Sequence, residues 1–530
     1  MTSPNYPTLA ALITAKAERE PDLSILTFVA IEPDGSLVEE RRSFRELHDR
    51  AQALASGLHA LGLRPGQSFA IMMQNHPEFV EAMIAASMIG AVFVPIDPRT
   101  MGDKLQHMLS FAECRGVICA EPCADAVLAS AGACEGLGWL IVVGSRQHPA
   151  VRPSLTVTTY ASLLAPGGAP PPHAPSPDDP MFMMFTSGTT GAPKAVVQSH
   201  RVYMAAATAM RALGIGRDDV LYTGLSLTHI NAQGTLRTGL ALSAPVVVSG
   251  KFTKSRLWDI CRRYGCTVFN LLGGMIPEVF SAPSRPDDHD NPVRLIISAG
   301  MPAHLWNAYR ERFGVEICEV YGATEGGGAM FNPPGVGPIG SMGRPGPTFE
   351  ALTFDEQDRP CGPNEPGELR FRRKEGPAVQ VDYFKNAAAS ATKVQDGWFR
   401  TGDIVHYDDQ GWFFFHHRIG GGVRRNGDFV NTALVESVII QSGLAADIFV
   451  YGVAMPGDVA GEKALVAAIV PAQPERFQAE DLLDYCRSHL QRNDVPEIVQ
   501  VVCAIPKTVS EKPIELACIE LLRAYGLATA

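Results

Sequence analysis

The spacing of apolar residues over the first 160 positions predicts helices that alternate with short strands. From residue 44, apolar side chains recur at helical spacing, stop at the turn-forming residues 62–66, and resume as a strand, a helix and a strand up to Pro95. Residues 116–120 and 139–143 are further short apolar runs, with small-residue helical stretches between them. Strands that alternate with helices predict a parallel β-sheet built from right-handed crossovers.

The same alternation continues beyond a connection rich in proline, glycine and alanine. This connection, residues 163–180, can be neither helix nor central strand, so we expect it on the surface. Beyond it, buried strands are predicted at four apolar runs, which are residues 181–185, 245–249, 266–272 and 293–299. The chain therefore reads as an α/β protein over most of its length.

The last third of the chain has a different pattern. From about residue 345 to 419 the segments are shorter and alternate between apolar and polar residues, which is typical of antiparallel, partly exposed strands. Three consecutive glycines follow at 420–422, and the final block has its own strands and a helical stretch over 479–491. Because a run of glycines lets two compact bodies reorient, we expect a hinge at 420–422 between domains 1–419 and 420–530.

Composition and charge exclude several classes of protein. The 530 residues include 45 Lys and Arg against 56 Asp and Glu, a net charge of −11, which argues against a nucleic-acid binder. No stretch reaches the ~18 apolar residues of a membrane span, and the start has no secretion signal, so we expect a cytoplasmic protein. The 11 cysteines read as mostly buried, reduced thiols, and the spacing of Cys114, Cys119 and Cys123 does not favour a metal site.

One loop carries the groups that a polyphosphate needs. The apolar run 181–185 leads into TSGTTGAPK, which offers unobstructed backbone N–H groups, hydroxyls and one ammonium at one place. Its glycines are three apart and its lysine precedes alanine, so it is not a Walker A loop. The alternative interpretation of this segment alone is an ordinary Ser/Thr/Gly turn.

With this loop and three further ordered motifs, nearly the whole chain resembles the adenylate-forming superfamily. That superfamily contains acyl-CoA synthetases, luciferases and peptide-synthetase adenylation domains, and the chain looks most like bacterial carnitine and crotonobetaine CoA ligases. The resemblance implies a large domain of parallel αβ-layered sheets with a β-barrel-like subdomain, and a small mobile α+β C-terminal domain. It also implies that the loop closes over the phosphates of ATP through Thr186, Ser187, Gly188, Thr189, Thr190, Gly191 and Lys194.

Two further motifs match the family's nucleotide-binding turns. In ICEVYGATEGG, the resemblance implies that Tyr321, followed by Gly322, packs on adenine and that Glu319 accepts the adenine amino group. It also implies that Thr324 contacts the α-phosphate and that Glu325 binds Mg²⁺, an ion that prefers carboxylate and phosphate oxygens. The remaining matches are Ala299 and Gly300 beside adenine, Asp403 on the ribose hydroxyls and Arg418 before the hinge. Each motif taken alone could be an ordinary turn.

The fourth motif is IPKTVSEKPIE near the C-terminus. The resemblance aligns Lys512 with the lysine that reaches the substrate carboxylate and the α-phosphate during adenylation. The sequence departs from the family at Glu511, where glycine is usual, and at Gly420, where Asp or Lys is usual. Taken alone, Lys512 would be a solvated surface residue.

The acyl pocket is the least defined part of the sequence. The resemblance implies that His229 is the gate residue between the CoA tunnel and the substrate carboxylate. The alternative interpretation is a buried structural histidine. Asn231, Gln233 and Arg237 are polar residues that follow it. The other candidate acyl-pocket residues are Gly273, Gly274, Met275, Gly326 and Gly327. We find no aromatic and acidic cage for a trimethylammonium, so the acid stays open between short polar, aryl and bulkier alicyclic acids.

The predicted function is an ATP-dependent acid:CoA ligase that forms an acyl-adenylate with pyrophosphate release and then transfers the acyl group to the CoA thiol. Its expected cofactors are ATP, Mg²⁺ and coenzyme A, and its partners are these and a small carboxylic acid, with a homodimer as a possible assembly. Two alternatives remain: a non-catalytic nucleotide-binding relative, and an adenylating enzyme that passes the acyl group to a carrier protein or to oxidation.

Overall fold

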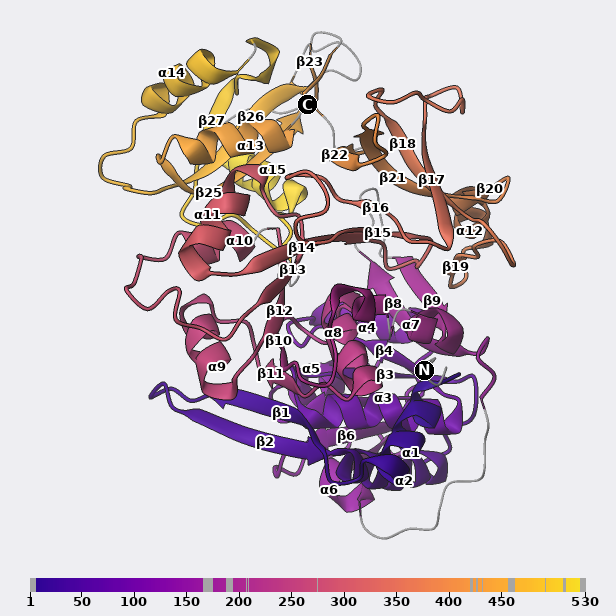
Figure 1. The fold of residues 1–530 in the computed structure, drawn as a ribbon. Helices are drawn as coiled ribbons and strands as arrows, with labels where there is room; N and C mark the ends of the chain where they lie inside the picture. Colours follow the sequence, from indigo (N-terminus) through magenta and orange to yellow (C-terminus); the bar gives the residue numbers. More distant parts are fainter. Residues whose placement is uncertain are drawn as a thin grey trace. The chain divides into compact units, whose positions relative to one another are not determined.

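A computed structural model describes most of the chain. The described residues are 6–164, 175–186, 194–205, 207, 209–273, 275–419, 423–425, 428–430, 432–455, 463–490, 492–508 and 511–524. The chain divides into two compact units, and Figure 1 traces it from indigo to yellow. The first unit comprises Met1–Asn270, Thr324–Gly326 and Val381–Thr392, and the second comprises Leu271–Ala323, Gly327–Gln380 and Lys393–Ala530.

The first unit contains a mainly parallel sheet with the strand order β19-β9-β8-β4-β3-β5-β6-β7. Its strands are β3 (Ser68–Met72), β4 (Val92–Pro95), β5 (Gly116–Ala120), β6 (Trp139–Val143), β7 (Thr156–Thr159), β8 (Pro180–Thr186), β9 (Lys194–Ser199) and β19 (Asp382–Tyr383). The strands from β8 to β7 run parallel, whereas β9 and β19 are antiparallel additions at one edge. The predicted strands 116–120 and 139–143 are confirmed.

A second set of strands in this unit has the order β12-β10-β11-β1-β2. The bounds are β1 (Ser24–Ile31), β2 (Leu37–Ser43), β10 (Leu221–Thr223), β11 (Val246–Ser249) and β12 (Val268–Leu272). The helices are α1 (Leu9–Arg19), α2 (Phe44–Ala60), α3 (Pro77–Ile89), α4 (Gly102–Phe111), α5 (Ala124–Ala131), α6 (Tyr160–Leu163), α7 (His200–Ala205), α8 (Ile230–Leu242), α9 (Leu257–Tyr264) and α12 (Ala387–Lys393). The helix predicted from residue 44 begins there because Ser43 and Glu46 form a capping box.

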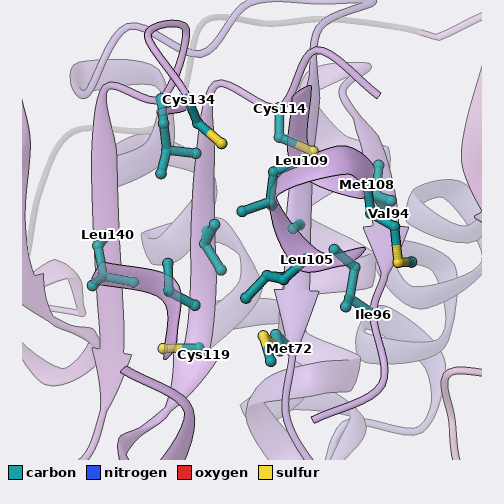
Figure 2. Packing of buried hydrophobic residues seen from close by; sticks show 14 of the residues in the cluster. Met72, Val94, Ile96, Leu105, Met108, Leu109, Cys114, Cys119, Cys134 and Leu140 are labelled. Carbon is teal, nitrogen blue, oxygen red and sulfur yellow. The ribbon is translucent and has the colours of Figure 1, made fainter. Parts of the chain in front are cut away.

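Figure 2 shows the apolar core on one face of the parallel sheet. Leu105, Met108 and Leu109 of α4 pack against strand residues that include Met72 and Val94. Cysteines contribute to this core as small apolar side chains, and Cys114, Cys119 and Cys134 are buried and free. Burial raises the pKa of the Cys114 thiol to about 12, so the thiol stays protonated at neutral pH.

The second unit contains the parallel pair β13–β14, to which β15 and β16 add antiparallel, and the antiparallel sheet that the sequence predicts from about residue 345 to 419. The strands β13 (Leu295–Ala299), β14 (Glu316–Gly322), β15 (Ala329–Asn332) and β16 (Arg344–Pro345) are neighbours in that order. A separate five-stranded antiparallel sheet contains β17 (Phe349–Phe354), β18 (Gly367–Arg373), β20 (Val394–Gln395), β21 (Trp398–Tyr407) and β22 (Phe413–Arg418). The helices α10 (Met275–Phe280) and α11 (Ala303–Phe313) also belong to this unit.

The C-terminal block has its own small sheet. Strand β25 (Ala445–Val453) pairs antiparallel with β26 (Ala464–Pro471), which pairs parallel with β27 (Ile498–Val501). The other elements are β23 (Val423–Arg425), β24 (Asp428–Val430), α13 (Thr432–Gln441), α14 (Ala479–His489) and α15 (Glu515–Ala524). The proposed hinge, 420–422, lies outside the described residues, so the domain boundary and its mobility stay predictions.

A partly buried glutamate makes the stability of this block depend on pH. Glu436 of α13 accepts the backbone N–H of Val450 at 2.8 Å, and burial raises its pKa to about 7 from the ordinary 4.5. Between pH 4.5 and 7 the folded carboxyl keeps a proton that the unfolded chain has lost, so stability falls as the pH rises through this window. Above pH 7 the full loss of folding stability is reached, and it amounts to up to about 3 kcal/mol.

We therefore expect Glu436→Gln to raise the melting temperature at pH 8 and to change it little at pH 4.5. The amide oxygen can still accept the N–H of Val450, and a neutral amide has no charge to bury. Thermal unfolding of the two proteins at both pH values checks this expectation. An equal difference at both pH values would contradict it.

Among the described residues, no helix combines the length and the apolar character that a membrane crossing requires.

Candidate active site

The predicted nucleoside-binding residues of the second unit lie close together. Tyr321 is near the end of β14, and its hydroxyl donates a hydrogen bond to Asp403 of β21. Asp403 is opposite Arg418 in the β21–β22 ladder, and its Oδ1 lies 3.8 Å from Nε of Arg418. Burial and the neighbouring carboxylate raise the pKa of the Tyr321 phenol. A neutral phenol therefore fixes a carboxylate whose remaining lone pairs suit a vicinal diol.

The turn after β13 is held by the buried Glu319. The Glu319 carboxylate accepts the backbone N–H of Gly300 and, at 3.1 Å, that of Met301. Burial raises the pKa of this carboxyl, and the two N–H donors oppose that rise. The observed contacts of Glu319 thus order the turn beside Ala299, and its contact with adenine stays a proposal.

This turn lies very close to Gly273, which follows β12 and belongs to the second unit. The N–H of Gly273 donates to the carbonyl oxygen of Ala299 at 2.9 Å. A Cβ atom on Gly273 would lie 3.0 Å from the oxygen of Gly300, which itself has a φ of +101°. Two glycines let the two backbones approach, so the structure brings the acyl candidate Gly273 next to the adenine candidates Ala299 and Gly300.

The ends of the phosphate-binding loop lie in the first unit. Thr186 at the end of β8 pairs with Lys194 at the start of β9, and its hydroxyl lies 3.4 Å from the carbonyl oxygen of Lys194. The Lys194 ammonium lies 5.5 Å from the centre of the Tyr383 ring. The remaining predicted loop residues, Ser187, Gly188, Thr189, Thr190 and Gly191, lie outside the described residues.

Tyr383 also holds the proposed metal ligand. Its hydroxyl donates to Oε1 of Glu325 at 2.7 Å, and the adjacent Thr324 accepts the side-chain amide of Gln198 through its carbonyl oxygen. A carboxylate fixed in this way fits a hard cation whose other ligands are phosphate oxygens. In the described part of the chain, no group of three or more His, Cys, Asp or Glu could hold a metal ion by itself.

Tyr383 was not predicted from the sequence. Its position depends on the pairing of the two-residue strand β19 with β9, nearly 190 residues earlier in the chain. No local motif marks it. A tyrosine that touches both Lys194 and Glu325 nevertheless orders two of the charges proposed to surround the phosphates.

We expect Tyr383→Phe to weaken the use of Mg²⁺ while leaving the fold intact. The ring that covers Lys194 stays, but Glu325 loses a donor, and a hydrogen bond to a charged group is worth about 1.5–3 kcal/mol. The Mg²⁺ concentration for half-maximal adenylation should rise by roughly tenfold or more. An unchanged Mg²⁺ titration would show that Tyr383 does not position Glu325.

The acyl-pocket candidates have different surroundings. His229 is at the N-cap position of α8 without a side-chain capping bond, and Asn231 in the first turn accepts a hydrogen bond from the amide of Asn270. Met275 is 1% exposed at the start of α10. A Cβ on Gly326 would lie 2.7 Å from Val202, and one on Gly327 would lie 2.2 Å from Phe399. Packing therefore explains these two glycines, Gly274 is outside the described residues, and a role in binding acid stays a prediction.

Lys512 is exposed in a tight turn of the second unit. Its backbone N–H lies 3.1 Å from the hydroxyl of Thr508, and its carbonyl accepts the N–H of Thr508 at 2.7 Å. Glu511 has a φ of +57°, in the left-handed region where glycine costs least. The departure from glycine at 511 is thus a backbone cost as well as a change of charge.

Lys507, in the same segment, is paired. Its ammonium lies 2.9 Å from Glu278 and 2.8 Å from Asp447, and its side chain is 11% exposed. Burial lowers the pKa of this ammonium, but the two carboxylates outweigh burial and raise it overall. Lys507 is therefore an anchor, and Lys512 stays the lysine to which the family resemblance assigns the chemistry.

Comparison with known proteins identifies the class of protein. The family model for the AMP-binding enzyme matches residues 13–380, and that for the AMP-binding enzyme C-terminal domain matches residues 434–512. The medium/long-chain-fatty-acid–CoA ligase FadD17 of Mycobacterium tuberculosis is 30% identical over 472 residues, 87% of each chain. The crotonobetaine/carnitine–CoA ligase of Salmonella paratyphi A is 28% identical over 484 residues, 89% of this chain and 92% of that protein.

Solved structures share the fold. The anthranilate CoA ligase AuaEII, in complex with anthranoyl-AMP, has a TM-score of 0.85 at 21% identity and covers 98% of this chain and 99% of its own. A benzoate CoA ligase from Burkholderia xenovorans LB400 has a TM-score of 0.82 at 23% identity, with 96% and 99% covered.

The chain is an adenylate-forming enzyme of the acyl-CoA synthetase branch. It belongs to the AMP-binding enzyme family, and it is an ATP-dependent acid:CoA ligase of the AMP-forming type.

Proposed function

We propose that this ligase acts on a polar carboxylic acid rather than on a long alkyl acid. The observation that supports this is a set of polar residues on α8 and β12, where Asn231, Gln233, Arg237 and Asn270 carry amide and guanidinium groups. Gln233, Arg237 and Asn270 are buried. Polar groups buried without a partner are costly, and a polar substrate offsets that cost when it binds.

In the first half-reaction the acid carboxylate attacks the α-phosphorus of ATP, and pyrophosphate leaves. Both reactants are anions, so the chain must supply positive charge where they meet. Lys512 neutralises the carboxylate and the α-phosphate, and Lys194 binds the outgoing phosphates. Thr324 contacts the α-phosphate, and Glu325 would hold Mg²⁺, which supplies further positive charge when bound.

The nucleoside is held by the second unit. Asp403, fixed by Tyr321, accepts the two ribose hydroxyls, and Tyr321 stacks on adenine beside the turn that Glu319 orders. Phe371 lies parallel to the Tyr321 ring, with centroids 6.2 Å apart, which sets the plane of that ring. Positioning of ATP thus comes from groups that hydrogen bonds already fix.

In the second half-reaction the CoA thiol attacks the acyl carbon and AMP leaves. The hinge at 420–422 and a movement of the C-terminal domain that withdraws Lys512 are part of the proposal. The need for ATP and CoA supports a cytoplasmic location, and a homodimer stays a prediction that the mass in solution tests.

A screen of acids tests the proposed function. Pyrophosphate and AMP are measured with and without CoA for short polar, aryl, alicyclic and long alkyl acids. We expect polar acids to give pyrophosphate, with CoA completing turnover to the thioester. The best rates with long alkyl acids would contradict the polar class, and ATP binding without pyrophosphate from any acid would favour a non-catalytic relative.

A further inference from the structure

Arg237 of α8 is a buried cation without a matching carboxylate. Among the described residues, three arginines are buried: Arg42, Arg237 and Arg370. Arg42 pairs with Glu81 at 2.7 Å and with Glu40 at 2.6 Å. Arg370 pairs with Glu368 at 2.9 Å and also with Asp358. No described acidic side chain pairs with Arg237, which is 9% exposed.

The protein provides hydrogen-bond acceptors for only some of the N–H donors of this guanidinium. Nη1 donates to the carbonyl oxygen of Tyr203 at 2.6 Å, and the guanidinium carbon lies 4.8 Å from the centre of the Tyr203 ring. Its Nε has no partner among the described residues. Burial lowers the pKa of Arg237. A neutral amide could make the bond to Tyr203, so the bond alone does not account for a charge whose burial is costly.

The Arg237 side chain extends along α8 toward the turn that carries the acyl-pocket candidate Asn231. A Cβ on Gly234 would lie 3.7 Å from Nη2 of Arg237, so the side chain runs back one turn along the helix. Asn231 and His229 are in the turn that precedes Gly234, and the start of the helix has no side-chain cap. The positive end of the helix dipole and the arginine thus add to each other.

Three further buried polar atoms on α7, α8 and β12 have no hydrogen-bond partner among the described residues. They are the hydroxyl of Tyr203 on α7, Oε1 of Gln233 on α8 and Oδ1 of Asn270 on β12, each unpaired among the described residues. Native proteins pair most buried polar atoms, so each unpaired one calls for a physical explanation. The Arg237 guanidinium and the Tyr203 hydroxyl are donors, which fit an oxyanion. The amide oxygens of Gln233 and Asn270 are acceptors, so they fit a donor group of a ligand and not its carboxylate.

We infer that Arg237 binds a second carboxylate of the acid substrate, so that the enzyme activates one carboxyl group of a dicarboxylic acid. The inference rests on the proposed function and narrows its polar acid to one class. The bound carboxylate supplies the counter-charge that the protein does not. A monocarboxylic acid of the same length leaves Arg237 unpaired and is disfavoured for that reason.

Matched pairs of acids test this inference. Straight-chain and aromatic dicarboxylic acids are each compared with the monocarboxylic acid in which methyl replaces the second carboxyl group, and kcat/KM is measured from pyrophosphate release. For the accepted length we expect the diacid to exceed the monoacid by about a hundredfold or more. In Arg237→Met that ratio should fall to near one or invert, and in Arg237→Lys a preference for the diacid should persist.

Arg312 supplies the matched control. It stacks on Phe280 and Phe313 at 5.3 and 4.8 Å, as Arg237 stacks on Tyr203, but it is paired with Asp288 at 2.7 Å. Arg312→Met should lower stability and leave the diacid preference unchanged. Should Arg237→Met not fold, the wild-type ratio and the lysine variant still decide.

The outcomes separate the two proposals. Equal use of monoacids and diacids by the wild type, or a ratio that Arg237→Met leaves unchanged, overturns the role of Arg237 while the ligase function stands. Absence of pyrophosphate with every acid overturns the proposed function, and the inference with it.

Discussion

Replacing Lys512 with alanine should lower the rate of acyl-adenylate formation by about a hundred- to a thousandfold. The proposed role of this ammonium is to neutralise two anions as their oxygens approach one phosphorus atom, and the loss of one such stabiliser costs about 3–4 kcal/mol in other enzymes. The second half-reaction should survive, because the thiol attack does not use this lysine. Acyl-hydroxamate trapping measures the first step, and thioester formation from added acyl-adenylate measures the second.

Lys507→Ala is the matched control for Lys512. It removes the same charge five residues away, from a lysine that is paired with Glu278 and Asp447. We expect this variant to lose stability but to keep most of its adenylation rate. Equal losses in the two variants, or full adenylation activity in Lys512→Ala, would show that Lys512 has no special part in the reaction.

Replacing Glu325 with glutamine should reduce adenylation by about a hundredfold and raise the Mg²⁺ requirement. The amide keeps the shape and can still accept the hydrogen bond of Tyr383, but it removes the negative charge that a hard cation prefers. Measuring the rate over a range of Mg²⁺ concentrations separates a lost ligand from a lost fold. Partial rescue at high Mg²⁺ is the expected pattern.

Asp382→Asn is the control for the loss of one carboxylate charge in the same unit. Asp382 precedes Tyr383 on β19, and its side chain is exposed. This variant should titrate with Mg²⁺ like the wild type. If it behaves like Glu325→Gln, the effect is one of net charge, and Glu325 is not a specific ligand.

Much of the fold was predictable because its strands are short apolar runs bounded by turns. The predicted strands 116–120 and 139–143 match β5 and β6, and the helix predicted at 479–491 is α14, Ala479–His489. The run 266–272 begins as a strand only at Val268, because the N–H groups of Thr267 and Val268 both bond to the carbonyl of Val220. Periodicity finds an element, whereas such bonds set its ends.

The candidate site was predictable only where its chemistry is local in sequence. Thr324 and Glu325 are adjacent, so a motif can reveal both. Tyr383 joins Glu325 through a pairing between strands far apart in the chain, and no short motif contains that information. The same holds for Arg237, whose polarity is visible in the sequence but whose missing counter-charge depends on packing.

One departure from the family and one acyl-pocket candidate gain a physical meaning from the backbone and its neighbours. Glu511 occupies a left-handed conformation at φ +57°, which explains why glycine suits that position. Gly327 was predicted to open space for the acyl group, yet a Cβ there would lie 2.2 Å from Phe399. A glycine in a sequence thus indicates that another group approaches the backbone closely, but the sequence does not tell whether that group belongs to a ligand or to the protein.

The exchange of labelled pyrophosphate into ATP tests the central claim most directly, because it reports reversible attack of the acid on the α-phosphorus. With an accepted acid and without CoA, labelled ATP should accumulate, and the exchange should fall in Lys512→Ala and Glu325→Gln. Exchange that does not depend on any acid, or cleavage of ATP to ADP and phosphate instead, would contradict the account.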